Sequence, residues 1–343
     1  MVRVAINGFG RIGRCFLRAA WHDPEVEIVA INDLGDIKNL AYLLQYDTVY
    51  RAFGAPVSAE GSELVVGAKR IKYLSEKDPT HLPWKDLAID VVVEATGVYD
   101  SFEKAAVHLA SGARRVVLSA PAHGHHDPGE HEQGATVLMG INEEKLGTCQ
   151  VSSNASCTTN AASPVISIMH EKIGVSKAIL STTHAYTASQ RIVDSPSPKD
   201  LREGRAGAMN IIPSSTGAAI AVTKALPALL GKFDGISLRV PVVAGSVADI
   251  TFITSRDTTV EEVNRTLEDA SKELKWKGIF TVSHDPLVSS DIIGQPYGSI
   301  ADLQMTRVVD GNLVKILAWY DNEMGYTYTL VRHVKAAGAH IQS

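Results

Sequence analysis

One cysteine stands in a polar segment that could carry nucleophilic chemistry. Cys157 lies in the run S-N-A-S-C-T-T-N, Ser153–Asn160, and the residues after it, Ala161–Met169, indicate the first turns of a buried helix. A thiol at a helix N-terminus meets the positive end of the helix dipole and unpaired backbone N–H groups, so the sequence predicts a stabilised thiolate with a lowered pKa. The alternative is a buried structural cysteine, because a free cysteine often serves simply as a small hydrophobic residue.

A second motif predicts a dinucleotide site near the N-terminus. The apolar segment Val2–Ile6 indicates a strand, and it is followed by N-G-F-G-R-I-G, Asn7–Gly13, and then by a helix-like run. In this context Gly8 would allow a tight turn, Gly10 would let the backbone approach a pyrophosphate, and Gly13 would allow the helix to pack closely on the strand. The helix N-terminus would then bind the anion.

An acidic residue indicates which dinucleotide is bound. A second strand, Glu27–Ile31, is followed by Asn32 and Asp33, and Asp33 comes 20 residues after Gly13. A carboxylate at this place accepts hydrogen bonds from ribose hydroxyls and repels a 2′-phosphate, so we predict NAD rather than NADP. The strands, glycines, helix and acid together favour a dinucleotide fold over a glycine-rich turn that serves packing alone.

The remaining pattern of the first half completes an α/β domain. Apolar strands at 90–97 and 115–121, with a crossover helix at 101–111, are typical of a parallel sheet that is covered on both faces. At 343 residues the chain is long enough for two domains. We therefore predict a Rossmann NAD-binding domain over residues 1–156, to which a C-terminal helix within 322–343 returns.

The second half, 157–321, predicts an α+β catalytic domain with a mainly antiparallel sheet. Thr259 opens an amphipathic helix through a capping box. The polar stretch Thr187–Asn210 carries several arginines and indicates a loop for binding or assembly rather than a disordered excursion. The predicted strands are 178–184, 236–240, 247–255, 300–309 and 312–320, with a hairpin turn at Asp310-Gly311.

Composition argues against several other classes of protein. The net charge is −5 and no Lys/Arg block is present, which argues against a nucleic-acid or membrane surface. No apolar run reaches the length of a membrane-spanning helix, and no signal peptide is expected before the first strand. Three cysteines are too few for a disulfide framework, so we expect a cytoplasmic protein. We predict no metal site, because the histidine-rich segment 123–134 is more typical of a solvated loop than of a metal-binding tract.

Taken together, the motifs resemble those of the phosphorylating glyceraldehyde-3-phosphate dehydrogenase family nearly end to end. The cysteine and tryptophan motifs are highly specific in combination. The resemblance implies NAD as cofactor and a homotetramer in which the 187–210 loop approaches the cofactor of a neighbouring subunit. The matching segments are I-N-G-F-G-R-I-G (6–13), I-N-D-L (31–34), E-A-T-G (94–97), S-A-P (119–121), S-N-A-S-C-T-T-N (153–160), N-I-I-P-S-S-T-G-A-A (210–219), R-V-P (239–241) and W-Y-D-N-E-x-G-Y (319–326).

The resemblance also implies the chemistry. Cys157 would attack the aldehyde of glyceraldehyde 3-phosphate to form a hemithioacetal, and His184 would take a proton as hydride leaves, assistance typically worth ~10²–10⁴-fold. Inorganic phosphate would then attack the resulting thioester and release an acyl phosphate. The residues themselves single out His184 from the 12 histidines only by its position at a strand end.

Two anion sites and a cofactor site follow from the same resemblance. Thr187 and Arg239 would hold the substrate phosphate, since the arginine fork matches phosphate oxygens; without the resemblance, Arg239 would suggest a salt bridge on a strand surface. The site of the attacking phosphate would be lined by Ser156, Arg202, Thr216 and Gly217, and Thr158 is expected among the substrate- or phosphate-binding residues. Cofactor contacts are expected at Gly8, Gly10, Arg11, Ile12, Gly13, Asp33, Lys77, Ser119 and Asn322.

The chain departs from the family pattern in four places. Ala161 stands where a second cysteine is usual, and that cysteine is not required for the chemistry. The loop 123–134 is longer than usual, with no role that the sequence suggests. Segment Val243–Ser246 replaces the P-N-V-S of many relatives and could alter loop contacts. Ser189 stands where many relatives carry Asp, although others have a small hydroxyl residue.

Two other functions fit parts of the pattern. A dehydrogenase of erythrose 4-phosphate would share the fold and the thiol, but Arg202 beside Thr216-Gly217 favours the phosphate-using enzyme. A dinucleotide fold that serves as an RNA-binding or scaffolding module would leave the site vestigial. The acidic charge balance argues against it, because binding to a nucleic-acid backbone depends on clustered positive charge.

Overall fold

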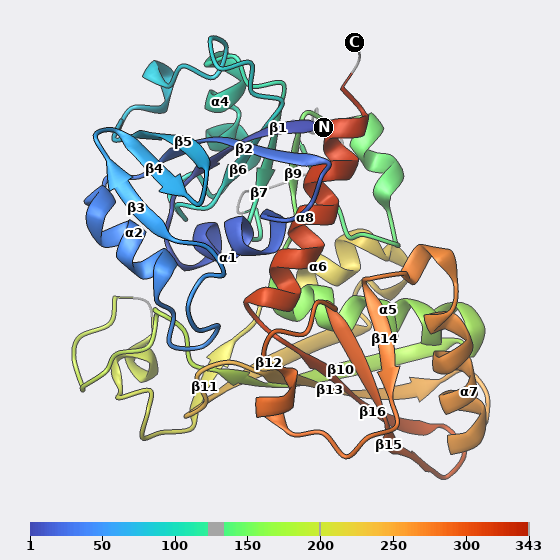
Figure 1. Ribbon diagram of the computed structural model, residues 1–343. Helices are drawn as coiled ribbons and strands as arrows, with labels where there is room; N and C mark the ends of the chain where they lie inside the picture. The colour runs from blue at the N-terminus through green and yellow to red at the C-terminus, as the bar shows by residue number, and fades with distance from the viewer. Residues whose placement is uncertain (123–133, 199, 342–343) are drawn as a thin grey trace. The chain divides into compact units, whose positions relative to one another are not determined.

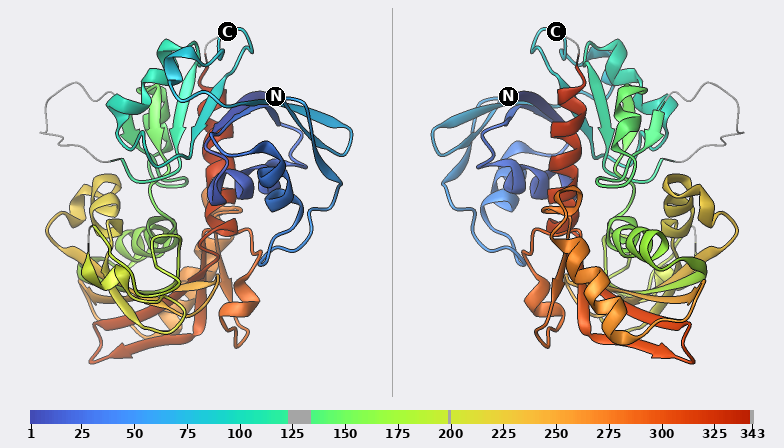
Figure 2. Two further views of the ribbon diagram at one scale, coloured as in Figure 1. Left: turned by 90° about the vertical axis from the view of Figure 1, so that its left-hand side faces the viewer. Right: turned by 90° about the vertical axis from the view of Figure 1, so that its right-hand side faces the viewer.

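The computed structural model describes residues 1–122, 134–198 and 200–341, which divide into two compact units (Figure 1). Unit 1 comprises Met1–Ala155 and Leu330–Ser343, and unit 2 comprises Ser156–Thr329. The last helix, α8 (Met324–Ala339, red in Figure 2), begins in unit 2 and ends in unit 1. Within the described ranges, no helix has both the length and the apolarity needed to span a membrane.

Unit 1 is a Rossmann-type domain. Its strands are β1 (Val2–Asn7), β2 (Val26–Asn32), β3 (Val57–Glu60), β4 (Glu63–Val66), β5 (Lys69–Leu74), β6 (Val91–Glu94), β7 (Arg115–Leu118), β8 (Gly134–Thr136) and β9 (Val151–Ser153). The described residues form a nine-stranded sheet in the order β3-β4-β5-β2-β1-β6-β7-β9-β8. The strands from β5 to β8 pair in parallel, and β3 and β4 extend the sheet as an antiparallel ribbon. The predicted α/β fold is confirmed.

The helices of unit 1 connect these strands. They are α1 (Arg11–Ala20), α2 (Ile37–Gln45), α3 (Phe102–Ala105), α4 (Val107–Ala110) and the 3₁₀ helices η1 (Pro79–His81) and η2 (Glu143–Gly147). The prediction of one crossover helix over 101–111 is wrong, because the chain tightens at Ala106 and forms two short helices. The buried residues Phe102, Ala105 and His108 recur every three residues, which suits the tighter winding of a 3₁₀ turn better than a regular α-helix.

Unit 2 has a mixed, mainly antiparallel sheet, as predicted. Its strands are β10 (Val175–Ala185), β11 (Ile212–Ser215), β12 (Phe233–Val240), β13 (Ser246–Thr254), β14 (Phe280–Ser283), β15 (Ser299–Val309) and β16 (Leu313–Tyr320). The order in this seven-stranded sheet of the described residues is β11-β12-β10-β13-β16-β15-β14. Only the β10–β12 and β14–β15 pairings of these residues are parallel; β11–β12, β10–β13, β13–β16 and β15–β16 are antiparallel.

Helices cover the sheet of unit 2. The helix α5 (Cys157–Lys172) packs on the middle strands, α6 (Ala218–Ala225) on β12, and α7 (Val260–Ser271) on β14 and β15 (Figure 1). The covered side carries the buried residues Leu180, Ile250 and Ile316. The 3₁₀ helices are η3 (Leu201–Gly204), η4 (Pro227–Leu229), η5 (Leu274–Trp276) and η6 (Ser289–Ile292).

The predicted capped helix is α7. Thr259 is its N-cap, and the Thr259 hydroxyl oxygen accepts a hydrogen bond from the Glu262 N–H. The carboxylate of Glu262, however, pairs with Arg256 and accepts from the Thr258 hydroxyl, so the reciprocal half of the capping box is replaced by these contacts.

Candidate active site

The start of α5 places Cys157 beside a sharp backbone turn. Ala155, fully buried, adopts φ 54°, a left-handed conformation that is uncommon for a residue with a side chain. Ser156 is the N-cap of α5, and its hydroxyl oxygen accepts a hydrogen bond from the Thr159 N–H. Cys157 is therefore the first residue of a 16-residue helix.

A histidine faces this thiol. Cys157 Sγ lies 3.3 Å from His184 Nε2, and His184 Nδ1 lies 2.6 Å from the carbonyl oxygen of Ala185. Because a carbonyl oxygen only accepts, Nδ1 must carry the imidazole proton, and Nε2 then presents its lone pair to the thiol. The pair can pass a proton from Sγ to Nε2, which is what a thiol needs to become a nucleophile.

Burial governs the ionisation of both groups. It raises the pKa of the Cys157 thiol, although the charge of Arg239 and hydrogen bonds from Thr158 favour the thiolate. Burial, followed by the charge of Arg239, lowers the pKa of His184 to about 3. The predicted lowering of the thiol pKa is therefore wrong for Cys157 by itself, because desolvation outweighs the helix N-terminus. Proton transfer within the pair leaves its net charge unchanged, so burial opposes that step less than it opposes ionising either group alone.

The Tyr320 hydroxyl bridges the helix that carries Cys157 and the strand that carries His184. This hydroxyl lies 3.0 Å from Thr158 Oγ1, on the helix of Cys157, and 2.8 Å from Thr182 Oγ1, on the strand of His184. The Tyr320 ring meets the His184 ring edge-on at a centroid distance of 5.8 Å. The sequence patterns placed Tyr320 in the tryptophan motif but gave it no role; only the folded sheet shows that it lies beneath the pair.

Arg239 is the cation beside the pair. The parallel pairing of β10 and β12 sets Arg239 directly opposite His184. In the described part of the chain Arg239 forms no ion pair, and its buried Nε and Nη1 atoms have no hydrogen-bond partner. Buried donors are nearly always satisfied in folded proteins, so these two point to an anionic ligand.

The other predicted anion-site residues have different surroundings. Thr187 Oγ1 lies near Ser189 Oγ at 3.1 Å and donates to Gln190. Thr216 and Gly217 immediately precede α6, and the Thr216 hydroxyl accepts from the Ala218 N–H. The Ser156 hydroxyl lies 2.8 Å from Thr159 Oγ1.

Arg202 is the predicted phosphate ligand that the structure supports least. Its side chain is exposed, and its guanidinium forms two-point contacts with Asp200, with Nη2 2.8 Å from Oδ2 and Nε 3.1 Å from Oδ1. Arg202 is therefore already paired with a carboxylate, whereas Arg239 is not.

The glycine turn of unit 1 has the environments that the sequence predicts. Gly8 has φ 97°, and a Cβ there would lie 2.6 Å from Thr96 N. A Cβ on Gly13 would lie 2.1 Å from the carbonyl oxygen of Gly8, so the helix and turn touch at this point. A Cβ on Gly10 would meet no heavy atom within 4 Å, which leaves its backbone open to a ligand.

A pocket of about 400 Å³ opens in unit 1 beside this turn. Its lining includes Gly8, Gly10, Asn32, Asp33 and Lys77. Asp33 Oδ2 accepts from the Phe9 N–H at 2.6 Å, which fixes the carboxylate at the pocket wall. An open glycine turn and a fixed carboxylate in one pocket suit a dinucleotide.

Three further predicted cofactor residues belong to unit 1 but do not line this pocket. Arg11 pairs with Asp47 and lies over the Tyr50 ring, 5.2 Å from its centroid. Ile12 follows it in α1 and is partly exposed, and the Ser119 N–H donates to the carbonyl of Glu94.

Asn322 in unit 2 is held by a residue that the sequence patterns did not assign. Its Oδ1 accepts from the Gly245 N–H at 3.2 Å and from the Ser246 hydroxyl at 2.9 Å. The Ser246 hydroxyl in turn accepts from the Ala185 N–H at 3.1 Å. Ser246 therefore links Asn322 to the end of the strand that carries His184, and the Asn322 amide nitrogen remains as the donor for a ligand carbonyl. The departure of segment Val243–Ser246 from the family pattern was the sequence signal that could have drawn attention to Ser246.

The described residues contain no cluster of three or more His, Cys, Asp or Glu side chains that could hold a metal ion. Residues 123–133 of the histidine-rich segment lie outside the described residues. Cys15, Cys149 and Cys157 are all free thiols.

A Rossmann unit with an acid just after its second strand, in a chain that also carries a thiol–imidazole pair, is typical of an NAD-dependent dehydrogenase with a cysteine nucleophile. The family model for glyceraldehyde 3-phosphate dehydrogenase, NAD binding domain, matches residues 2–102, and that for glyceraldehyde 3-phosphate dehydrogenase, C-terminal domain, matches residues 156–322. The chain belongs to the glyceraldehyde-3-phosphate dehydrogenase family, and it is an oxidoreductase that uses NAD.

Curated relatives agree over almost the full length. A glyceraldehyde-3-phosphate dehydrogenase of Geobacillus stearothermophilus is 46% identical, with 96% of each chain covered. That of Thermotoga maritima is 47% identical over 96% of this chain and 97% of its own. Glyceraldehyde-3-phosphate dehydrogenase 1 of Bacillus subtilis is 45% identical, again with 96% of each chain covered.

Proposed function

We propose that the protein catalyses the oxidative phosphorylation of D-glyceraldehyde 3-phosphate to 1,3-bisphosphoglycerate with NAD, a reaction of glycolysis and gluconeogenesis. The observation that carries this proposal is the 3.3 Å contact between Cys157 Sγ and His184 Nε2 beside the unpaired Arg239 guanidinium. Family membership supports the same substrate, because the relatives are named for it.

The proposed reaction begins on sulfur. Cys157 Sγ adds to the aldehyde carbon and the thiol proton moves, through His184 Nε2, to the former carbonyl oxygen, which gives a hemithioacetal. His184 Nε2 then accepts the hydroxyl proton as the C–H hydride leaves, and the sulfur is left in a thioester. NAD, when bound, accepts that hydride.

Phosphate completes the cycle. A phosphate oxygen attacks the thioester carbonyl, the C–S bond breaks, and the acyl phosphate leaves. Cys157 departs as a thiolate and recovers its proton from His184. The energy of the aldehyde oxidation is thereby kept in the acyl phosphate rather than lost to hydrolysis.

The anion sites are assigned by charge and pairing. We place the substrate phosphate on Arg239 and Thr187, because Arg239 has buried donors without partners. We place the attacking phosphate at Thr216-Gly217, where α6 begins, together with Ser156 and Thr158. Arg202 would join only by exchanging Asp200 for phosphate, an exchange that costs little because exposed ion pairs are weak.

We assign the cofactor contacts in the same way, from charge and from available hydrogen-bonding groups. The backbone of the glycine turn would hold the pyrophosphate, Asp33 would accept from the ribose hydroxyls, and the Asn322 amide would donate to the nicotinamide carboxamide. The remaining contacts in this proposal are Arg11, Ile12, Lys77 and Ser119.

A phosphate-titrated dehydrogenase assay tests the function. With glyceraldehyde 3-phosphate and NAD, steady NADH formation is expected to require added phosphate and to saturate with it, and NADP is expected to be a much poorer substrate because of Asp33. Equal turnover of erythrose 4-phosphate without phosphate would instead favour the erythrose-4-phosphate reaction. Absence of turnover with both aldehydes, together with RNA binding at moderate salt, would favour a scaffold role.

We also propose a cytoplasmic homotetramer. The free state of all three cysteines suits a reducing compartment. The side of the unit 2 sheet opposite to α5 exposes Ile179, Ile236 and Leu313, an apolar surface that a second copy of the chain could cover. Sedimentation equilibrium is expected to give four times the chain mass of 36.8 kDa, and a mass of one chain at micromolar concentration would contradict the proposal.

A further inference from the structure

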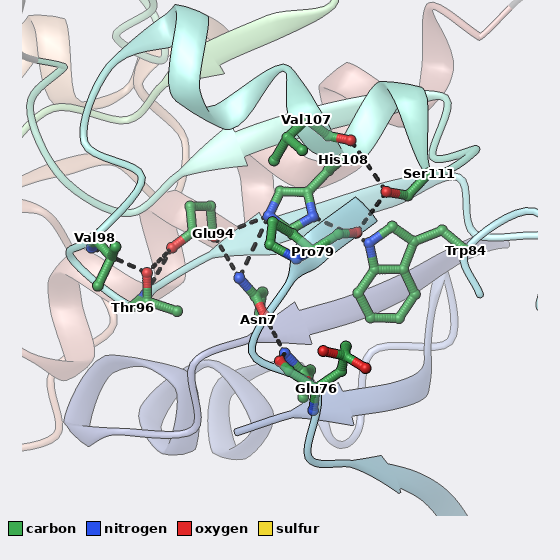
Figure 3. Close-up of polar contacts among 11 residues, drawn as sticks. Asn7, Glu76, Pro79, Trp84, Glu94, Thr96, Val98, Val107, His108 and Ser111 are labelled. Carbon is green, nitrogen blue, oxygen red and sulfur yellow. Dashed lines mark hydrogen bonds and ion pairs between the residues drawn. The ribbon is translucent and has the colours of Figure 1, made fainter. Parts of the chain in front are cut away.

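A cluster of polar side chains lies beneath the nucleotide pocket of unit 1 (Figure 3). It consists of Asn7, Trp84, Glu94, Thr96 and His108, and all except Thr96 are buried. The proposed chemistry uses none of them. They come from the end of β1, the segment after η1, the end of β6 with the residues that follow it, and α4, so residues far apart in the sequence meet at the carboxyl ends of two interior strands of the sheet.

Trp84 fixes the tautomer of His108. The indole Nε1 lies 3.1 Å from His108 Nδ1, and because an indole N–H only donates, Nδ1 must accept. The imidazole proton is then on Nε2, which lies 3.0 Å from Glu94 Oε2 and donates to it. The order of donation is therefore from Trp84 to His108 to Glu94.

Glu94 collects four donors. Oε2 accepts from His108 and from Asn7 Nδ2, the latter at 2.6 Å, and Oε1 accepts from both the N–H and the hydroxyl of Thr96. All four groups donate hydrogen bonds to Glu94. A buried carboxylate requires such partners, because its oxygens can only accept. If one donor is lost, the carboxylate must turn or admit water, and the other partners shift with it.

Those partners form the pocket wall. Asn7 Oδ1 accepts from Asn32 Nδ2 at 2.8 Å, and Asn32 Oδ1 accepts from the Glu76 N–H at 2.9 Å. The Thr96 hydroxyl accepts from the Val98 N–H at 3.0 Å. All five of these residues line the pocket, so one hydrogen-bonded chain joins the last residues of β1 and β2 to the segments that follow β5 and β6.

His108 and its helix also touch the wall directly. The Tyr99 ring, which lines the pocket, meets the His108 ring edge-on at 5.8 Å. At the end of α4, the Ser111 hydroxyl donates to the carbonyl of Pro79, another lining residue, at 2.5 Å (Figure 3). These contacts set the position of the wall relative to α4.

We propose that His108, held in its Nε2–H tautomer by Trp84, is a positioning residue for the dinucleotide. It acts through Glu94, whose hydrogen bonds fix Asn7 and Thr96 in the positions that the ligand requires. The inference rests on NAD occupying this pocket, as the proposed function requires. It predicts that loss of the His108 hydrogen bonds weakens NAD binding and leaves the chemical step unchanged.

The test compares His108→Leu with His108→Gln by measuring the dissociation constant of NAD, kcat at saturating NAD, and the thermal midpoint. Leucine has no polar atoms, whereas a glutamine amide can accept from Trp84 and donate to Glu94 as the imidazole does. The leucine variant is expected to weaken NAD binding by about 10-fold or more, because hydrogen bonds to charged groups are among the strong ones. The glutamine variant is expected to stay within about 3-fold of the original affinity, with kcat retained in both.

Val116→Ala is the matched control, since Val116 belongs to the same core cluster as Trp84 and its side chain is apolar. It is expected to lower the thermal midpoint without changing NAD affinity. The proposal is overturned if His108→Leu binds NAD as tightly as this control does, or if glutamine weakens binding as much as leucine.

Should the leucine variant not fold, Trp84→Phe removes the indole donor and keeps an aromatic ring at this buried position, at the cost of some core volume. It is expected to weaken NAD binding about 3-fold, and unchanged affinity overturns the proposal. If the original protein itself binds no NAD, it is the proposed function that fails, and the role of His108 fails with it.

Discussion

Cys157→Ser is expected to lower kcat by at least about 1,000-fold and to abolish the acylated protein. A serine hydroxyl is a far weaker acid than a thiol, and His184, whose pKa burial lowers to about 3, is a weak base for removing its proton. The change removes the sulfur that must form the thioester and leaves the pocket of unit 1 untouched. NAD affinity should therefore be retained while the burst of NADH formation disappears.

The measurement is a single-turnover reaction followed by intact-protein mass spectrometry. Cys149→Ser is the matched control, because Cys149 is also a partly exposed free thiol, and it is expected to keep full activity. An acyl adduct on the Cys157→Ser protein, formed at the original rate, would show that another residue is the nucleophile.

His184→Asn should lower the acylation rate by ~10²–10⁴-fold near neutral pH, because asparagine cannot take the thiol proton. The variant must react through the thiolate fraction of Cys157, and burial raises the pKa of that thiol. Below this pKa the thiolate fraction rises about tenfold with each pH unit, so the rate of the variant should climb steeply between about pH 6 and 8. In the original protein His184, with its pKa of about 3, already has a free Nε2 throughout this range, and its acylation rate should be nearly flat.

Stopped-flow measurement of the NADH burst across this pH range gives both profiles. His170→Asn makes the same substitution on α5 and should behave like the original protein. If His184→Asn had the same flat profile as the original protein, His184 would not be the base.

The parts of the fold that the sequence predicted are those set by local rules. The spacing of Gly8, Gly10 and Gly13 reflects backbone contacts within one turn, and the structure shows the same contacts. Strands were recognised by their apolar runs, since a strand of a covered sheet is buried on both sides. The split of the 101–111 helix was missed, because a repeat of three and a repeat of 3.6 differ little over so short a segment.

The site was predicted less completely, because its contacts join distant segments. The pairing of His184 with Arg239 depends on the parallel register of β10 and β12, which no local pattern encodes. The bridging role of Tyr320 needs the positions of α5, β10 and β16 together. The attachment of Arg202 to Asp200 could have been suspected, since the two residues are only two positions apart.

The left-handed backbone at Ala155 explains one letter of the cysteine motif. Ala155 is fully buried, and its surroundings hold a methyl group. A larger side chain there would add crowding to an already unfavourable backbone torsion. Glycine would accept the torsion readily but would widen the range of shapes open to the unfolded chain. We therefore expect this position to accept only the two smallest amino acids, for a reason of handedness that involves no substrate.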